Sequence, residues 1–357
     1  MLDLADIKRI QTEMEQPVLS LYLNVDPGYQ ENQAAQPAWR VWVKNALRDL
    51  DRDFDADGKD IWQAIRERAE TFLAQYLPES KALVLFMGSN TQETFALPLA
   101  TENYAAFGEP LVTPLFWKLD EYKRYLIALV DQQEARLLLA HLGDADEEER
   151  MEIDLDEYDF REMTISPATS YGKELNQGSN RDAFEDVIDD HRSRFFKSVV
   201  DKIAEVAEQH DSKRIILGGA EAAAHAVRNS MPEKMLGQLV DVLPIPLRTP
   251  PHAIIERVQP VAYECERTYE RQLLDGVIDM AKSGARGALG QKQVMDALAQ
   301  QRVELLIVPF PVTDDELLQA LPGLALQSSS SIEFVHGEAA RRLNEEGGIA
   351  ARLYYAI

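Results

Sequence analysis

The sequence predicts an α/β protein built from several domains. Apolar runs of strand length recur along the chain and alternate with segments of helical periodicity, a pattern typical of sheets covered by helices. The chain has 357 residues, whereas a single domain usually holds about 100 to 200. We therefore predict three α/β domains, at residues 1–122, 123–248 and 249–357.

The first predicted domain opens with a helix over residues 3–15 and the buried strand PVLSLYLNV at 17–25. Two more helices are expected over 38–54 and 61–76, followed by the strands KALVLFMG and ETFALPLA. Residues 102–122 have no regular pattern. We expect them to form an irregular segment that leads out of this domain.

The second predicted domain begins with a hairpin of two apolar runs, YLIALVD and EARLLLAHLG. A polar loop at 171–180, YGKELNQGSN, precedes a long helix that is expected to start at residue 181. The segment KRIILGGA predicts a strand that ends at Gly218 and Gly219. The helix predicted for EAAAHAVRNS completes a βαβ-type unit. The Gly-Gly pair suits either an anion-binding turn or a tight turn, and the lack of G-x-G-x-x-G spacing favours the tight turn.

The third predicted domain starts with a helix initiated by Pro251. Helices and strands then alternate as QKQVMDALAQQ, VELLIVPFP, SIEFVHG, EAARRLNEE and the terminal IAARLYYAI. This order predicts a compact α/β sandwich.

The charge of the chain limits its partners. A formal net charge of −24 argues against a protein that coats nucleic acid nonspecifically, because that affinity comes from Lys and Arg, and we expect no DNA partner. Residues 144–162 hold eleven Asp and Glu against Arg150 and Arg161. A solvated loop or strand edge is favoured over a cation site for this stretch.

The sequence lacks the motifs of membrane proteins, secreted proteins, disulfide-bonded proteins, metalloproteins and serine hydrolases. No apolar run has the roughly 18 to 20 residues of a membrane span, and the N-terminus lacks a signal peptide, so we expect a cytoplasmic protein without membrane contact. Cys265 is the single cysteine, which excludes a disulfide framework. The six histidines show no H-E-x-x-H spacing and no G-x-S-x-G motif accompanies them. We expect neither a metal site nor a cofactor.

The long helix of the second domain carries a local exception to the acidic composition. His191, Arg192, Arg194 and Lys197 gather basic charge in its central turns. They are candidate contacts to RNA phosphate. Spacing of i to i+4, as between Asp190 and Arg194, supports a solvated helix face equally well.

The order of these segments resembles the archaeo-eukaryotic class 1 release factor family, which includes Pelota-like ribosome rescue factors, and in particular its bacterial members. The resemblance is strongest in ERQLLDGVIDMAKSGARGALGQKQVMDALAQQRVELLIV and in GGIAARLYY of the third domain. In the second domain, EARLLLAHLG, the long helix after a polar loop, and KRIILGGA match in order and spacing. The first domain matches more faintly, through PVLSLYLNV and KALVLFMG.

The resemblance implies a factor that enters the ribosomal A site. Its partners would be the ribosome and tRNA, with a translational GTPase or another protein as a further partner. The middle domain would be ribonuclease H-like, and the C-terminal domain would be similar to the kink-turn-binding ribosomal protein fold. Arg286 and Lys292 lie in the corresponding loop and are further candidate RNA contacts.

The resemblance also implies a Gly-Gly-Gln loop that positions water to cleave the peptidyl-tRNA ester. This chain has no Gly-Gly-Gln, and its loop carries Asn176, Gln177 and Gly178 instead. These three are the candidate catalytic residues, with Gln177 as the water-positioning group. The codon-reading Asn-Ile-Lys-Ser motif is also missing. Two hypotheses follow, a release- or rescue-like factor with a divergent loop and a noncatalytic binding protein on the same scaffold with protein partners.

Overall fold

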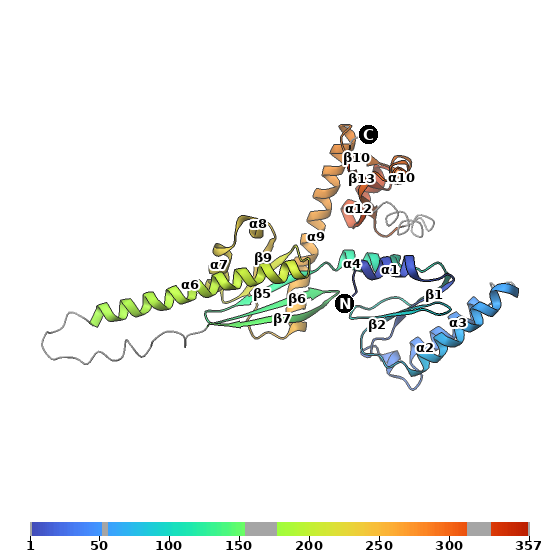
Figure 1. Cartoon of the computed structure of the whole chain (residues 1–357), viewed down its shortest axis with the longest axis horizontal. Coiled ribbons are helices and arrows are strands. Elements are labelled where there is room, and N and C mark those ends of the chain that lie inside the picture. Colours follow the sequence, from blue (N-terminus) through green and yellow to red (C-terminus); the bar gives the residue numbers. More distant parts are fainter. Residues whose placement is uncertain (1, 52–55, 154–176, 313–329, 356–357) are drawn as a thin grey trace. The chain divides into compact units, whose positions relative to one another are not determined.

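The protein, described by a computed structural model, is α/β with three separate sheets, which confirms the predicted class (Figure 1). The structure describes residues 2–51, 56–153, 177–312 and 330–355. The chain divides into two compact units, one of Met1–Lys123 with Glu266–Ile357 and the other of Arg124–Cys265. Within the described residues, no helix has both the length and the apolar character of a membrane span.

The first sheet of the first unit is antiparallel, in the order β3-β2-β1-β4. Its strands are β1 (Val18–Asn24), β2 (Ala82–Met87), β3 (Gln92–Leu97) and β4 (Tyr104–Gly108). All six residues of β2 are buried. The apolar runs that predicted β1 and β2 therefore correspond to the central strands of this sheet.

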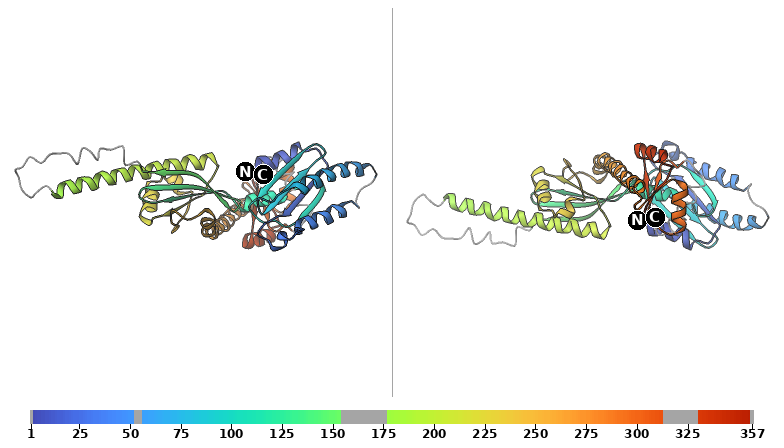
Figure 2. Two further views of the ribbon diagram at one scale, coloured as in Figure 1. Left: turned by 90° about the horizontal axis from the view of Figure 1, so that it is seen from below. Right: turned by 90° about the horizontal axis from the view of Figure 1, so that it is seen from above.

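Helices cover both faces of this sheet. Helix α1 (Leu4–Glu13) begins at a capping box between Asp3 and Asp6, and a short 3₁₀ helix, η1 (Gln30–Gln33), precedes α2. Helices α2 (Ala38–Leu50) and α3 (Ala56–Gln75) lie on one side of the sheet (Figure 2). Trp39 and Trp62 of these helices are buried in a core shared with β1 and β2. In Figure 1, α1 and α4 (Thr113–Glu121) lie on the opposite side of the sheet.

Residues 102–122 are more regular than the sequence predicts. They contain the edge strand β4 and helix α4. β4 is half-exposed and lacks the apolar run of a buried strand. α4 is only nine residues long and has Pro in its first turn, so periodicity gives little signal over its length.

The second sheet of the first unit has the order β10-β13-β11-β12. Its strands are β10 (Gly287–Leu289), β11 (Val303–Pro309), β12 (Ser331–Val335) and β13 (Ala350–Leu353), and only β11 and β12 pair in parallel. α12 (Gly337–Glu345) and the later turns of α9 (Pro251–Lys282) pack on it through one apolar core. α10 (Gln291–Ala299) contacts β10, β11 and β13.

The second unit contains a five-stranded mixed sheet in the order β7-β6-β5-β8-β9. β5 (Tyr125–Val130), β6 (Glu134–His141) and β7 (Asp144–Glu152) are antiparallel, which confirms the predicted hairpin. β8 (Ile215–Gly219) and β9 (Leu239–Leu243) continue the sheet in parallel with β5, as the predicted βαβ-type unit requires. β7 is an edge strand, in agreement with the solvated-edge interpretation of its acidic residues.

Three helices bury the two faces of this sheet. α6 (Gln177–Gln209) and α7 (Glu221–Ser230) share one core with β5, β6 and β8, and Figure 2 shows α6 lying along the sheet. The first turns of α9 cover the other face through Ile254 and Val258. A single helical turn, α8 (Glu233–Leu236), links α7 to β9.

Candidate functional site

Two of the three predicted catalytic residues lie at the N-terminal end of α6. Gln177 and Gly178 are the first two residues of this helix, so the helix begins four residues earlier than the periodicity predicts. Asn176 lies outside the described residues, as does the rest of the predicted loop up to that position. The candidate glutamine is therefore part of a 33-residue helix.

An apolar stripe along α6 anchors this helix in the second unit. Phe195, Val199, Ile203 and Val206 are all buried in the core shared with β5, β6 and β8. The C-terminal half of α6 is thus fixed on the sheet by close packing. Continuous helix from Gln177 joins the N-terminal end of α6 to this packed half.

The basic residues of α6 occupy its surface turns next to the buried half. Arg192 donates a hydrogen bond to Gln132 Oε1 at 2.9 Å, which ties the helix to the turn between β5 and β6, and it pairs with Asp189 at 3.3 Å. Arg194 pairs with Asp190, and the hydrogen bond from Arg194 lowers the pKa of Asp190. Lys197 is exposed and His191 is half-buried. Both hypotheses for this turn, an RNA contact and a solvated face, fit these positions.

The other two candidate RNA contacts lie in the third predicted domain. Arg286 precedes β10 and Lys292 is in the first turn of α10, and both are exposed. The turn between them contains Gly290, whose φ of +77° favours glycine.

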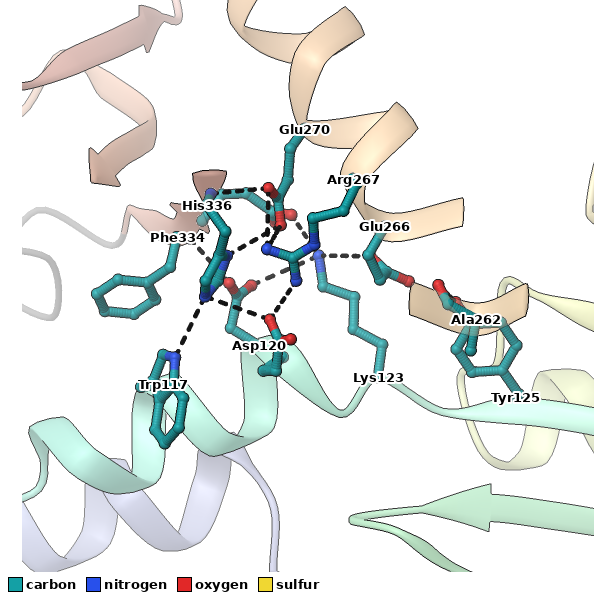
Figure 3. A network of polar contacts seen from close by, with 12 residues as sticks. Trp117, Asp120, Lys123, Tyr125, Ala262, Glu266, Arg267, Glu270, Phe334 and His336 are labelled. Carbon is teal, nitrogen blue, oxygen red and sulfur yellow. Dashed lines mark hydrogen bonds and ion pairs between the residues drawn. The ribbon is translucent and has the colours of Figure 1, made fainter. Parts of the chain in front are cut away.

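A buried polar network that the sequence does not predict connects α4, α9 and β12 in the first unit (Figure 3). Lys123 pairs with Asp120 at 3.4 Å, with Glu266 at 3.6 Å and with Glu333. Asp120 also accepts a hydrogen bond from the backbone N–H of Phe334 at 2.8 Å. These side chains come from segments far apart in the sequence, and their contacts join α4 to α9 and β12.

Burial and neighbouring charges change the protonation of this network. Burial raises the pKa of Asp120 well above its usual value and outweighs the attraction of Lys123, while Glu333 adds to the rise. Burial also opposes the charge of Lys123, but attraction by the Asp120, Glu333 and Glu266 carboxylates is stronger in sum and raises the pKa of Lys123. Lys123 therefore stays charged, whereas Asp120 retains its proton to higher pH than an exposed aspartate.

The second half of the network is centred on Arg267 and His336. Arg267 pairs with Glu121 and with Glu270, the latter at 3.1 Å. His336 Nδ1 lies 3.2 Å from Glu270 Oε1, and His336 Nε2 lies 3.3 Å from Glu121 Oε2. The backbone N–H of His336 also donates to Glu270 Oε2 at 2.8 Å.

Glu121, Glu270 and His336 offer three ligand atoms within 4.8 Å of one another, close enough for a metal ion. The same two carboxylates already pair with the guanidinium of Arg267, whose side chain is only 11% exposed. A divalent ion in this group would lie against that buried cation, which is electrostatically unfavourable. We therefore interpret the three side chains as parts of an ion-pair network and not as a metal centre.

The sequence offers only a weak signal for this network. Glu266, Arg267 and Glu270 have helical spacing within α9, but such pairs are common on exposed helix faces. His336 follows the buried strand β12 and has no metal-ligand spacing. The network becomes visible only when α4, α9 and β12 are placed together.

Comparison with known proteins agrees with the predicted resemblance. Residues 110–262 match the model of bacterial archaeo-eukaryotic release factor family 10. The match spans all five strands of the second unit together with α6 and α7. No curated protein matches the chain.

The solved structures that match the chain include the following three. One is an archaeal translation termination factor, with 18% identity, a TM-score of 0.28 and coverage of 98% of this chain and 96% of that chain. Another is archaeal Pelota in a ribosome-bound model with ABCE1, with 17% identity, a TM-score of 0.48 and coverage of 79% and 74%. The third is S. cerevisiae Dom34, with 13% identity, a TM-score of 0.45 and coverage of 77% and 81%.

Proposed function

We propose that the chain is a ribosome-associated release- or rescue-like factor, because residues 110–262 match the model of bacterial archaeo-eukaryotic release factor family 10. Its sites of action would be the A site and the peptidyl-tRNA held in the ribosome. The partners we propose are the ribosome and its tRNA, with a translational GTPase as a protein partner. The family match carries this proposal.

The length of α6 and the burial of its C-terminal half support the proposal. A helix of 33 residues with its C-terminal half buried in a sheet carries its N-terminal residues on a rigid support. Catalysis by positioning needs such a support, because small displacements of a positioning group cost large factors in rate. Gln177 begins this helix.

The proposed reaction is hydrolysis of the peptidyl-tRNA ester. The side-chain amide of Gln177 would orient the attacking water, and neighbouring backbone N–H groups, including those near Asn176 and Gly178, would stabilise the oxyanion that forms. No side-chain base is required in this scheme, since the amide acts by orientation.

Measurement of peptide release from ribosomes loaded with peptidyl-tRNA tests the reaction. We expect the wild-type protein to accelerate release and Gln177→Ala to reduce the rate about 10²-fold or more, as for loss of an oriented polar group. Gln209→Ala, an exposed change at the other end of the same helix, should leave the rate unchanged. If wild type and Gln177→Ala both match the uncatalysed rate, the protein is not a hydrolase.

Ribosome association is tested separately by sedimentation through a sucrose gradient at several salt concentrations. Reversal of charge at Arg194 and Lys197 should weaken association and reduce its salt dependence, because each lost phosphate contact lowers the slope by about 0.7 to 0.9. Lys213→Glu, at an exposed position of the same unit, is the control. Equal association of both variants would remove the basic turn of α6 from the interface.

The competing proposal is a noncatalytic binding protein that keeps the release-factor scaffold. The order Asn-Gln-Gly in place of Gly-Gly-Gln favours this alternative, because two glycines would allow positive φ angles and closer approach to the substrate. Association with ribosomes without accelerated release would support it. Absence from ribosomal fractions, also after stalling, would overturn the ribosomal role in both proposals.

A further inference from the structure

His336 lies between elements from the two ends of the first unit. It follows β12 and precedes α12, and its side chain contacts Glu121 and Trp117 of α4 and Glu270 of α9 (Figure 3). The imidazole ring also lies 5.1 Å from the ring of Phe310, which stacks on Trp117 at 4.6 Å. The histidine side chain is 13% exposed.

Both ring nitrogens of His336 face carboxylate oxygens. Nδ1 is 3.2 Å from Glu270 and Nε2 is 3.3 Å from Glu121. An imidazole donates hydrogen bonds from both nitrogens only when it is protonated. These two contacts therefore fit the charged form of the side chain.

A third contact fits the neutral form. The indole N–H of Trp117 points to His336 Nε2 at 3.4 Å. Nε2 accepts this hydrogen bond only when it carries no proton. One nitrogen thus faces an acceptor, Glu121, and a donor, Trp117, and protonation decides which of the two it binds.

We propose that His336 is a proton-operated latch that holds α4 against α9 and β12. In the charged state the imidazolium binds Glu121 and Glu270 and neutralises part of their charge. In the neutral state Nε2 accepts from Trp117 while Nδ1 still donates to Glu270, so the hydrogen bond to Glu121 is lost. Uptake of a proton strengthens the contact between the N-terminal and C-terminal sheets of the first unit, and its loss weakens the contact.

Charged groups from three elements take part in the network that contains the latch. His336 contacts Glu121 and Glu270 directly. The charged groups of the whole network are Asp120, Glu121 and Lys123 in or next to α4, Glu266, Arg267 and Glu270 on α9, and Glu333 on β12. Five of these are carboxylates and two are permanent cations.

The latch predicts opposite pH responses for two substitutions in the full-length protein. Hydrogen–deuterium exchange is measured in peptides covering α4 and β12 at about pH 5.5 and about pH 8, on either side of the range in which histidine changes charge. Each variant is compared with wild type at the same pH. The intrinsic exchange rate therefore cancels.

His336→Gln should accelerate exchange about tenfold or more at acidic pH, as for loss of a hydrogen bond to a charged group, with little effect at alkaline pH. Glu121→Gln also removes the pair with Arg267, so it should accelerate exchange at both pH values and more strongly at acidic pH. Trp117→Phe retains an aromatic ring next to Phe310 but removes the donor, so it should accelerate exchange mainly at alkaline pH. His336→Lys keeps a permanent cation and should reduce the difference between the two conditions. Peptides of β8 in the second unit should not respond.

The control variant is His225→Gln, at an exposed position of α7, which should behave as wild type at both pH values. The latch is overturned if His336→Gln and Trp117→Phe accelerate exchange equally at both pH values, because a purely structural role has no such pH dependence. If His336→Gln does not fold, Glu121→Gln gives the same test with the histidine intact. An equal effect of Glu121→Gln at both pH values also contradicts the proposal.

Discussion

Gly219 closes β8 against the backbone of β5. Its φ is +103°, and a Cβ atom at this position would lie 1.9 Å from the carbonyl oxygen of Val130. We predict that Gly219→Ala lowers the free energy of unfolding of the second unit by about 2 to 4 kcal/mol, since the change adds backbone strain to a clash with main-chain atoms. Urea unfolding followed by circular dichroism measures the change.

A glycine with free space for a side chain provides the control for Gly219. Gly276 lies inside α9, and a Cβ there would meet no atom within 4 Å. Gly276→Ala should stabilise the protein by up to about 1 kcal/mol through helix propensity. Equal effects of the two substitutions would mean that close packing on Val130 does not explain Gly219.

The pair Gly218 and Gly219 predicts the end of a strand but not the kind of turn that follows it. The pattern predicts a stop after β8 but leaves an anion-binding turn and a tight turn open. The close approach to Val130 supports the tight turn. That neighbour belongs to a strand far away in the chain, so local spacing does not identify it.

At the scale of elements, α4 is fixed to β12 through Asp120, whose carboxylate accepts from the N–H of Phe334. Burial raises the folded-state pKa of Asp120, so its contribution to stability is present at low pH and is lost as pH rises through that pKa. Asp120→Asn keeps an acceptor without the charge. We predict that it flattens the pH dependence and stabilises the protein by about 1 to 3 kcal/mol above that pKa.

Thermal unfolding of both proteins across a pH series measures this effect. Asp275→Asn serves as the control, because Asp275 pairs with Arg342 on the surface and its side chain is 51% exposed. Such a pair should contribute no more than about 1 kcal/mol. A parallel pH dependence of wild type and Asp120→Asn would show that Asp120 is ionised throughout.

The elements differ in how well the sequence predicts them. Long apolar runs and helical periodicity predict β1, β2, β5, β6, β8 and α6, because each is buried along most of its length or along one full stripe. The same signals are absent from β4 and α4, which are short and half-exposed or begin with Pro. The network around Lys123 and His336 depends on α4, and a sequence that does not predict the helix cannot predict its contacts.

At the scale of the whole molecule, α9 contributes to the cores of both units. Ile254 and Val258 are buried in the second unit, and Leu274, Val277 and Ile278 are buried against β11 and α12 in the first. The pair Pro250 and Pro251 predicts a boundary after residue 248. The division at Cys265 instead assigns the first turns of α9 to the second unit. The boundary after residue 248 and the division at Cys265 therefore imply different fragments that fold independently.

Fragments of the second unit distinguish these boundaries. A fragment of Arg124–Cys265 retains both faces of the five-stranded sheet covered, so we predict that it unfolds cooperatively. A fragment of residues 124–248 loses Ile254 and Val258 and exposes Ile127, Leu129 and Ile216. Each fully buried side chain of this size contributes about 1.5 to 3 kcal/mol, so the shorter fragment should be less stable by about 3 to 6 kcal/mol. Equal urea midpoints would assign α9 wholly to the first unit and favour the boundary that the two prolines predict.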